Sequence, residues 1–244
     1  GDGDDGVRRQ TIVVSATLPA ELGARTAELC RAPRHVTIAQ REAAPLTVPA
    51  GVAQHVWVVA EHKKPRRMLR LLEKVQGSER RVLIFANKIK AVHFVAELLG
   101  RHGIAAEALT SQRTQPEREA CLRRFRAAEV QVLVATDVAA RGLQIDGLRY
   151  VLNWDFGSNL AQYVHRVGRT GRQGAGGTAW SFFTRNLRPL AADAVRLLRA
   201  HAQPVDPYLL QLVGGADGAE GDEDDGGGGG SDDGDAVSAA PAAV

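Results

Sequence analysis

Val82-Leu83-Ile84-Phe85 and Val132-Leu133-Val134-Ala135 are two short apolar runs that lack the polar alternation of a strand facing water. Strands that are apolar on both faces occur in sheets covered by helices on both sides, and such sheets are mostly parallel. A helical pattern follows the first run, since apolar residues in 89–101 recur at steps of three and four. These stretches predict an α/β fold.

The alternation of strands and helices extends over most of the chain. Strands are predicted at 55–60, 81–86, 104–109, 130–136, 149–154 and 178–184. Helices are predicted between or after them at 64–75, 89–101, 115–127, 159–167 and 188–200. Alternating units of this kind form a parallel sheet with right-handed crossovers and helices on both faces. Because sites in such folds gather at the carboxyl ends of the strands, we look for chemistry in the segments that follow them.

The two ends of the chain have a different character. Residues 1–38 contain a predicted strand at 11–14, a helix at 19–30 and a strand at 35–38, which is too little to fold alone and indicates the last β-α-β piece of a preceding domain. Prolines and a glycine in 39–54 predict a linker. We therefore expect one domain at 55–213. The acidic, Gly- and Ala-rich residues 214–244 predict a disordered tail.

The charges are segregated along the chain. Residues 7–213 hold all 31 Lys and Arg against 16 Asp and Glu, a net charge of +15, although the whole chain carries only +3. Such a body favours polyanions, although a generally Arg-rich composition is the alternative interpretation. The acidic tail would bind a basic protein partner, shield the basic body, or remain solvated.

The compartment is predicted only coarsely. The sequence has no apolar run of 18 residues and no signal-peptide pattern, so neither a membrane span nor secretion is expected. We interpret Cys30 and Cys121 as reduced, which fits an intracellular protein but does not choose between nucleus, cytoplasm and organelle. Because residue 1 is Gly, we expect the sequence to begin inside a longer protein.

The most specific segment is 165–172, His-Arg-Val-Gly-Arg-Thr-Gly-Arg. Arg169 and Arg172 are three residues apart, so both can project from one side of a helical end toward one anion. Each planar guanidinium can donate two parallel hydrogen bonds to phosphate oxygens. A solvated basic helix end is the alternative, which the glycine-interleaved spacing after a buried strand disfavours.

Several segments together resemble the motifs of DEAD-box helicases of superfamily 2, in the family's order. Ser15-Ala16-Thr17 is similar to motif III, and residues 136–142 and 165–172 are similar to motifs V and VI. Leu83-Ile84-Phe85 resembles motif IV, and Gln115-x-x-Arg118 resembles the element that follows it. The resemblance runs from about residue 8 to 213, and His165 stands where related families usually have Gln. It implies a RecA-like domain preceded by a partial first RecA-like domain.

In the family, ATP lies between two RecA-like domains. The resemblance implies that Arg169 and Arg172 contact the γ-phosphate and offset the charge that develops on it. His165 and Arg166 would bridge to the acidic motif of the first domain. Gln144 and Gly142 would lie on the nucleotide side of the site.

The resemblance also implies an RNA side and a coupling between the domains. Ser15 and Thr17 would link the two domains, with an ordinary helix N-cap as the alternative for Thr17. Phe85 would pack beneath motif VI, with an ordinary core role as the alternative. The residues expected to contact the RNA backbone are Thr136, Asp137, Arg141, Gly142 and Arg118.

The chain also departs from the family pattern. Gln144 stands where the family has an Asp associated with the ribose, so nucleotide affinity could be weaker, and Thr110-Ser111 replaces the usual His-Gly. The sequence contains neither a Gly-x-x-x-x-Gly-Lys-Ser/Thr phosphate loop nor Asp-Glu-Ala-Asp. We therefore expect ATP with Mg²⁺, no metal ligands in this chain, and Mg²⁺ ligands in the missing N-terminal half.

The leading hypothesis is the C-terminal part of an ATP-dependent RNA helicase that couples ATP hydrolysis to RNA binding and local duplex unwinding. Its partners would be RNA and the first RecA-like domain, and the chain alone would lack ATPase activity. The alternatives are a non-catalytic RNA- or partner-binding half-helicase module and a DNA-directed helicase of a neighbouring family.

Overall fold

The computed structural model describes residues 11–13, 26, 28–30, 34, 36, 46–75, 81–140, 145–171 and 176–215. The chain divides into two compact units, Gly1–Pro45 and Leu46–Val244, and every element described below belongs to the second. The predicted β-α-β piece of residues 1–38 and the tail at 214–244 lie, apart from isolated residues, outside the described part. None of the described helices has the length and apolar character that a membrane crossing requires.

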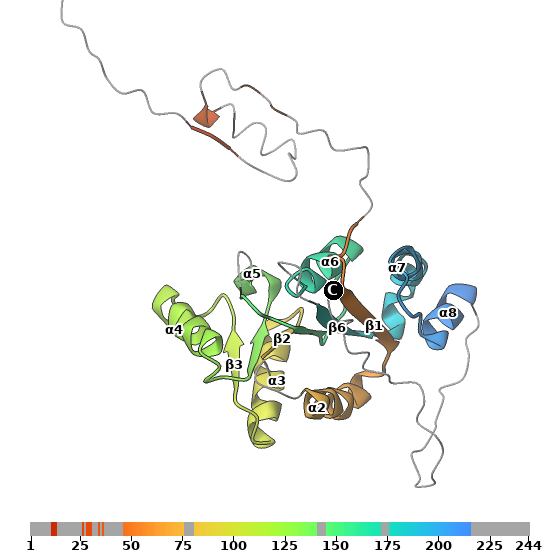
Figure 1. Cartoon of the computed structure of the whole chain (residues 1–244), viewed down its shortest axis with the longest axis horizontal. Helices are drawn as coiled ribbons and strands as arrows, with labels where there is room; N and C mark the ends of the chain where they lie inside the picture. The colour runs from red at the N-terminus through yellow and green to blue at the C-terminus, as the bar shows by residue number, and fades with distance from the viewer. Residues whose placement is uncertain are drawn as a thin grey trace, which may run out of the picture. The chain divides into compact units, whose positions relative to one another are not determined.

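Six strands form one parallel sheet (Figure 1). They are β1 (Val52–Val58), β2 (Val82–Phe85), β3 (Ala106–Leu109), β4 (Val132–Ala135), β5 (Tyr150–Asn153) and β6 (Gly177–Phe183). Their order across the sheet is β1-β6-β5-β2-β4-β3. The register places Phe85, the last residue of β2, between Ala135 of β4 and Asn153 of β5. The carboxyl ends of these three central strands therefore lie side by side.

Helices cover both faces of the sheet. They are α2 (Lys64–Lys74), α3 (Ile89–Arg101), α4 (Gln115–Arg126), α5 (Asp137–Ala140), α6 (Leu160–Val167), α7 (Arg188–Ala200) and α8 (Pro207–Gly214), with short 3-10 turns at Glu61–Lys63 and Arg185–Leu187. Figure 1 shows α2 and α3 below the sheet, with α5, α6 and α7 above it. The predicted RecA-like α/β fold with helices on both faces is confirmed.

The hydrophobic core has two layers because the central strands are apolar on both faces. Leu83 and Phe85 point to the layer under α4–α8, while Val82 and Ile84 point to the layer under α2 and α3. All four side chains are at most 1% exposed. This double burial is the physical reason why the strand shows no polar alternation.

The outer edge of β1 is covered by side chains from the segment between α7 and α8. The backbone N–H of Gln54 donates to Oε1 of Gln203 at 2.7 Å, and the N–H of Val58 donates to Oδ2 of Asp206 at 3.1 Å. The strand thus obtains side-chain acceptors on the side where none of the described strands supplies carbonyl groups.

The six predicted strands and five predicted helices are present, and the differences are local. β1 begins at Val52, inside the range assigned to the linker, because Val52 and Val56 pack into the core. The four-residue α5 and the helix α8 were not predicted. The start of α8 has a sequence signal, since Asp206 accepts a hydrogen bond from the Tyr208 N–H at 2.7 Å and Pro207 occupies the first turn.

Candidate nucleotide-facing site

A pocket of about 440 Å³ lies where the central strands end and α6 crosses them. We call it the α6 pocket. Five of its lining residues were singled out in the sequence analysis and come from motifs IV, V and VI. The others lie on α5, on α6 and in the turn before α6. The lining residues are Phe85, Asp137, Ala140, Asn159, Ala161, Gln162, His165, Arg166 and Arg169.

Local hydrogen bonds fix the start of α6. The Asn159 side chain accepts from the N–H of Gln162 at 2.8 Å, and the Gln162 side chain accepts from the N–H of Ser158 at 2.6 Å. Gly157 allows the turn to approach the helix, because a Cβ there would come within 2.8 Å of the Tyr163 nitrogen. On the inner face, the Tyr163 hydroxyl donates to Oε1 of Gln54 on β1 at 2.8 Å. The helix is therefore tied both to its own turn and to the sheet.

Arg166 is buried on the inner face of α6, with its side chain 1% exposed. Its Nε and Nη2 donate to the two carboxylate oxygens of Asp137 at 2.7 and 2.6 Å. Nη2 also donates to Oδ1 of Asn87 at 2.6 Å, and Nη1 donates to the Asp155 carbonyl at 2.7 Å. The guanidinium lies over the ring of Phe85, 5.3 Å from its centroid. Arg166 thus makes these contacts inside its own domain, and its expected bridge to a first domain stays a prediction.

Asp137 is the acidic partner of this arginine. Burial alone would raise the pKa of its carboxyl group. The hydrogen bonds and positive charge of Arg166, with a 2.6 Å hydrogen bond from Gln162, outweigh that effect and hold the pKa below its usual value. The carboxylate therefore stays ionised and joins α5 to α6. Its expected contact with RNA stays a prediction.

Three residues that the sequence analysis did not single out, Asn87, Asp155 and Lys64, extend the hydrogen-bond network of Arg166. Oδ2 of Asp155 accepts from the N–H of Asn87 at 2.9 Å, and Oδ1 accepts from Nζ of Lys64 at 3.1 Å. Lys64 is itself 1% exposed and also donates to Glu61 at 3.0 Å. No spacing in the sequence marks these residues, because α2, β2 and β5 bring them together only in the folded domain.

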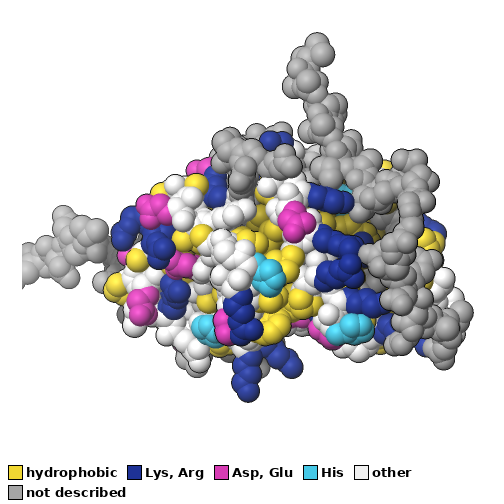
Figure 2. All heavy atoms as spheres, turned by 90° about the horizontal axis from the view of Figure 1, so that it is seen from below, with side chains coloured by type: hydrophobic (Ala, Val, Ile, Leu, Met, Phe, Trp, Pro, Cys, Tyr) yellow, Lys and Arg dark blue, Asp and Glu magenta, His cyan; other side chains and the backbone are white. Residues whose placement is uncertain are grey.

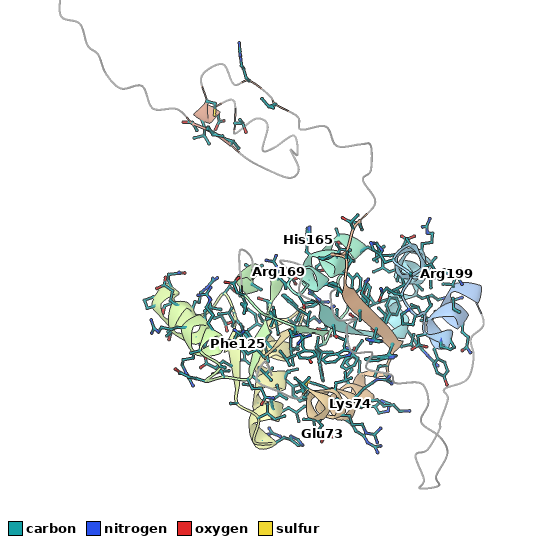
Figure 3. The ribbon with its side chains drawn as sticks, in the orientation of Figure 1. Glu73, Lys74, Phe125, His165, Arg169 and Arg199 are labelled. Carbon is teal, nitrogen blue, oxygen red and sulfur yellow. The ribbon has the colours of Figure 1, made fainter. Side chains whose placement is uncertain are left out.

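His165 and Arg169 lie on the other side of the helical segment. His165 is exposed and Arg169 is partly exposed, and both line the α6 pocket. Figure 3 shows the two residues close together at the α6 end of the molecule. The turn after α6 is held by the buried Thr170, whose hydroxyl lies 2.8 Å from the Leu148 carbonyl and 2.9 Å from the Arg149 carbonyl.

The predicted RNA-side residues that can be described are also neighbours. Thr136 directly follows β4, and its backbone carbonyl accepts a hydrogen bond from the Ala140 N–H, which closes α5. Arg118 of α4 donates to the Ala139 carbonyl at 3.1 Å, so α4 and α5 are joined at this point. The remaining predicted site residues lie outside the described ranges; they are Arg141, Gly142, Gln144, Arg172, Ser15 and Thr17.

The carboxylates in the described ranges do not form a metal site. No three His, Cys, Asp or Glu side chains come together there as a metal ion would require. The carboxylate that lines the α6 pocket, Asp137, is engaged by Arg166. The described residues therefore suit a bound anion better than a bound cation.

Comparison with known proteins points to a helicase family. The model of the helicase conserved C-terminal domain matches residues 63–174. The ATP-dependent RNA helicase DBP2 of Debaryomyces hansenii is 38% identical over 204 residues, which are 83% of this chain and 38% of the relative. This chain therefore spans well under half the length of that curated relative.

Solved structures are also similar. The chain matches the structure of the E. coli DEAD-box protein SrmB bound to regulator of ribonuclease activity A with 30% identity and a TM-score of 0.55, covering 66% of this chain and 89% of that one. The RNA helicase Prp28 of Chaetomium thermophilum, bound to ADP, gives 28% identity and a TM-score of 0.60, covering 82% of this chain and 46% of that one.

The parallel sheet with helices on both faces is that of a RecA-like domain. The matched domain model and the relatives specify it further. The chain belongs to the DEAD-box helicase family and carries that family's C-terminal helicase domain.

Proposed function

We propose that this chain supplies the second RecA-like domain of an ATP-dependent RNA helicase. A first RecA-like domain would hold the phosphates of ATP and the ligands of Mg²⁺. Closure of the two domains around ATP would bend bound single-stranded RNA and destabilise a short duplex. The similarity to ATP-dependent RNA helicases supports this proposal.

The observation that carries the proposal is that two neighbouring arginines differ in burial. Arg166 is buried and bonded to Asp137, whereas Arg169 is partly exposed at the α6 pocket. The first arginine fixes the helix on the sheet, and the second is presented from a rigid support. A guanidinium placed in advance can offset charge on a transferred phosphoryl group without reorganising during the reaction. We expect Arg172 to act beside Arg169.

RNA would bind along the neighbouring edge of the domain. Thr136 and α5 lie at the end of β4, and Arg118 reaches α5 from α4. Hydroxyl, guanidinium and backbone groups recognise phosphate and sugar rather than base edges. We therefore expect RNA binding here with little sequence preference.

The test is ATP hydrolysis by the complete protein in the presence and absence of RNA. Arg169→Ala should lower the RNA-stimulated turnover about 10³-fold or more, the range known for arginines that stabilise phosphoryl transfer. Arg196→Ala is the matched control, because its side chain is 79% exposed on α7, away from the α6 pocket. Both variants should keep the wild-type unfolding transition. Unchanged turnover in Arg169→Ala would refute the assignment.

A non-catalytic RNA-binding module is the second candidate, and the net charge of +15 over residues 7–213 is compatible with it. Residues 1–244 alone should bind RNA but show no ATP hydrolysis. Hydrolysis above that of an Arg169→Ala, Arg172→Ala double variant would contradict this expectation. Strand-separation assays on matched RNA and DNA duplexes would separate an RNA helicase from a DNA-directed one.

A further inference from the structure

A line of positive side chains runs along α2, on the face of the sheet opposite the α6 pocket. Lys63, Arg66, Arg67, Arg70 and Lys74 recur at steps of three and four residues, so they share one side of the helix. We call them the α2 stripe. Four of the five are exposed and Arg67 is partly exposed. At 1.5 Å per residue the stripe is about 16 Å long, which is several nucleotides of a single strand.

The surrounding surface is visible in Figure 2, which views the molecule from the side of α2 and α3. Lys and Arg side chains gather there beside a hydrophobic patch. Glu73 is the one acidic residue between 63 and 74, against the five Lys and Arg of the stripe. A stripe of charge alone is compatible with an ordinary solvated helix. A second feature of the same surface points to a ligand.

That feature is a column of stacked planar groups beside the stripe. The guanidinium of Arg67 lies over the indole ring of Trp57, 4.3 Å from its centroid. On the same strand, the rings of Trp57 and His55 are stacked with centroids 5.6 Å apart and planes at 14°. Both aromatic residues are only partly buried. The positive stripe therefore continues into half-exposed aromatic rings on β1.

A second stacked pair extends the rings across the sheet. The register places His55 of β1 opposite Trp180 of β6. Trp180 in turn stacks on Tyr150 of β5, with centroids 5.4 Å apart and planes at 10°. Trp180 is 5% exposed and anchors the group, whereas Tyr150 is partly exposed. We call Trp57, His55, Trp180 and Tyr150 the aromatic row.

We propose that the α2 stripe and the aromatic row form a second binding surface for single-stranded RNA. The cations of the stripe would contact successive phosphates, and bases would stack against the half-exposed rings. Proteins that bind single strands without sequence preference combine these two elements, a positive track and aromatic stacking partners. An acidic peptide could use the stripe but gains nothing from parallel aromatic planes, so RNA fits the surface better.

This surface is separate from the α6 pocket, because α2 packs on one face of the sheet and α6 on the other. It would hold a stretch of RNA that the carboxyl edge of the sheet does not contact. Longer single strands should then bind more tightly than short ones. The proposal does not depend on ATP turnover, so its failure and the failure of the proposed function can be told apart.

The first experiment measures binding of fluorescein-labelled single-stranded RNA to residues 1–244 by fluorescence anisotropy. Arg66→Glu with Arg70→Glu should weaken binding about tenfold or more. Losing two phosphate contacts should also lower the slope of log affinity against log salt by about 1.4. The matched control, Arg196→Glu with Arg199→Glu, makes the same charge change on exposed positions of α7 and should stay within about threefold of wild type. Equal weakening by both pairs would mean general charge attraction and would overturn the proposal.

The second experiment tests the rings. Trp57→Ala should weaken binding about fivefold without changing the salt slope, and Trp57→Phe should restore most of the loss because it keeps an aromatic plane. Photo-crosslinking with 4-thiouridine RNA should label peptides that contain β1 or β5. Wild-type affinity in Trp57→Ala would refute the stacking role. A different set of results would identify a protein-docking surface and overturn the proposal. In that case poly-glutamate displaces the RNA and binds Trp57→Ala and wild type equally, and the RNA forms no crosslinks to the rings.

Discussion

Replacing Arg166 tests whether a buried ion pair, rather than general packing, holds α6 in place. In Arg166→Ala the two charged hydrogen bonds to Asp137 disappear, along with those to the Asn87 side chain and the Asp155 carbonyl. Removing one partner of a buried pair costs about 3–5 kcal/mol, since the other partner keeps its desolvation penalty. Asp137 is 27% exposed and can regain some water, so we expect the lower end, about 3 kcal/mol.

The assay is equilibrium unfolding in urea, followed by tryptophan fluorescence. A loss of about 3 kcal/mol should also lower Tm by roughly 6–12 °C for a domain of this size. Arg196→Ala is the control, because its ion pair with Asp193 is exposed and such pairs contribute less than about 1 kcal/mol. If Arg166→Ala loses no more than the control, the network does not fix α6, and our explanation of how Arg169 is presented is wrong.

Three further predictions concern single groups. Because the folded-state pKa of Asp137 is lowered, its ionised carboxylate stabilises the folded domain at neutral pH, and this stabilisation is lost as pH falls below about 4. In Asp137→Asn, the free energy of unfolding, measured in urea, should therefore fall less steeply on the acid side. Burial raises the pKa of the Cys121 thiol to about 12, so iodoacetamide at pH 8 should modify Cys121, by mass spectrometry, only after unfolding. Gly177→Ala should lower Tm by several degrees, since a Cβ would lie 2.9 Å from the Gly171 nitrogen, whereas Gly100→Ala, with open space around it, should not.

The sequence was sufficient for the architecture because its signals are local. Val82–Phe85 shows the doubly buried strand directly, and the apolar spacing in 89–101 shows the face of α3 that meets the sheet. The helix α8 could have been predicted as well, since Asp206 and Pro207 form a recognisable start. The short α5 could not, because four residues carry too little periodicity.

The site was predicted less completely, because its geometry depends on several elements at once. Helical spacing groups Arg166 with Tyr163, three residues earlier and also buried, and separates both from the exposed His165. That grouping was available in the sequence and would have placed Arg166 inward. The support from Lys64, Asn87 and Asp155 was not available, since these residues are up to 91 positions apart. Only the strand order brings them to one point.

The side chains that cover β1 have a consequence for the behaviour of the domain in solution. An exposed strand edge invites another chain to add a strand, which leads to aggregation or domain swapping. Gln203 and Asp206 occupy two of the N–H groups that such a chain would need. Intermolecular strand addition at β1 must first displace both side chains. The segment between α7 and α8 therefore disfavours self-association of the domain through this edge.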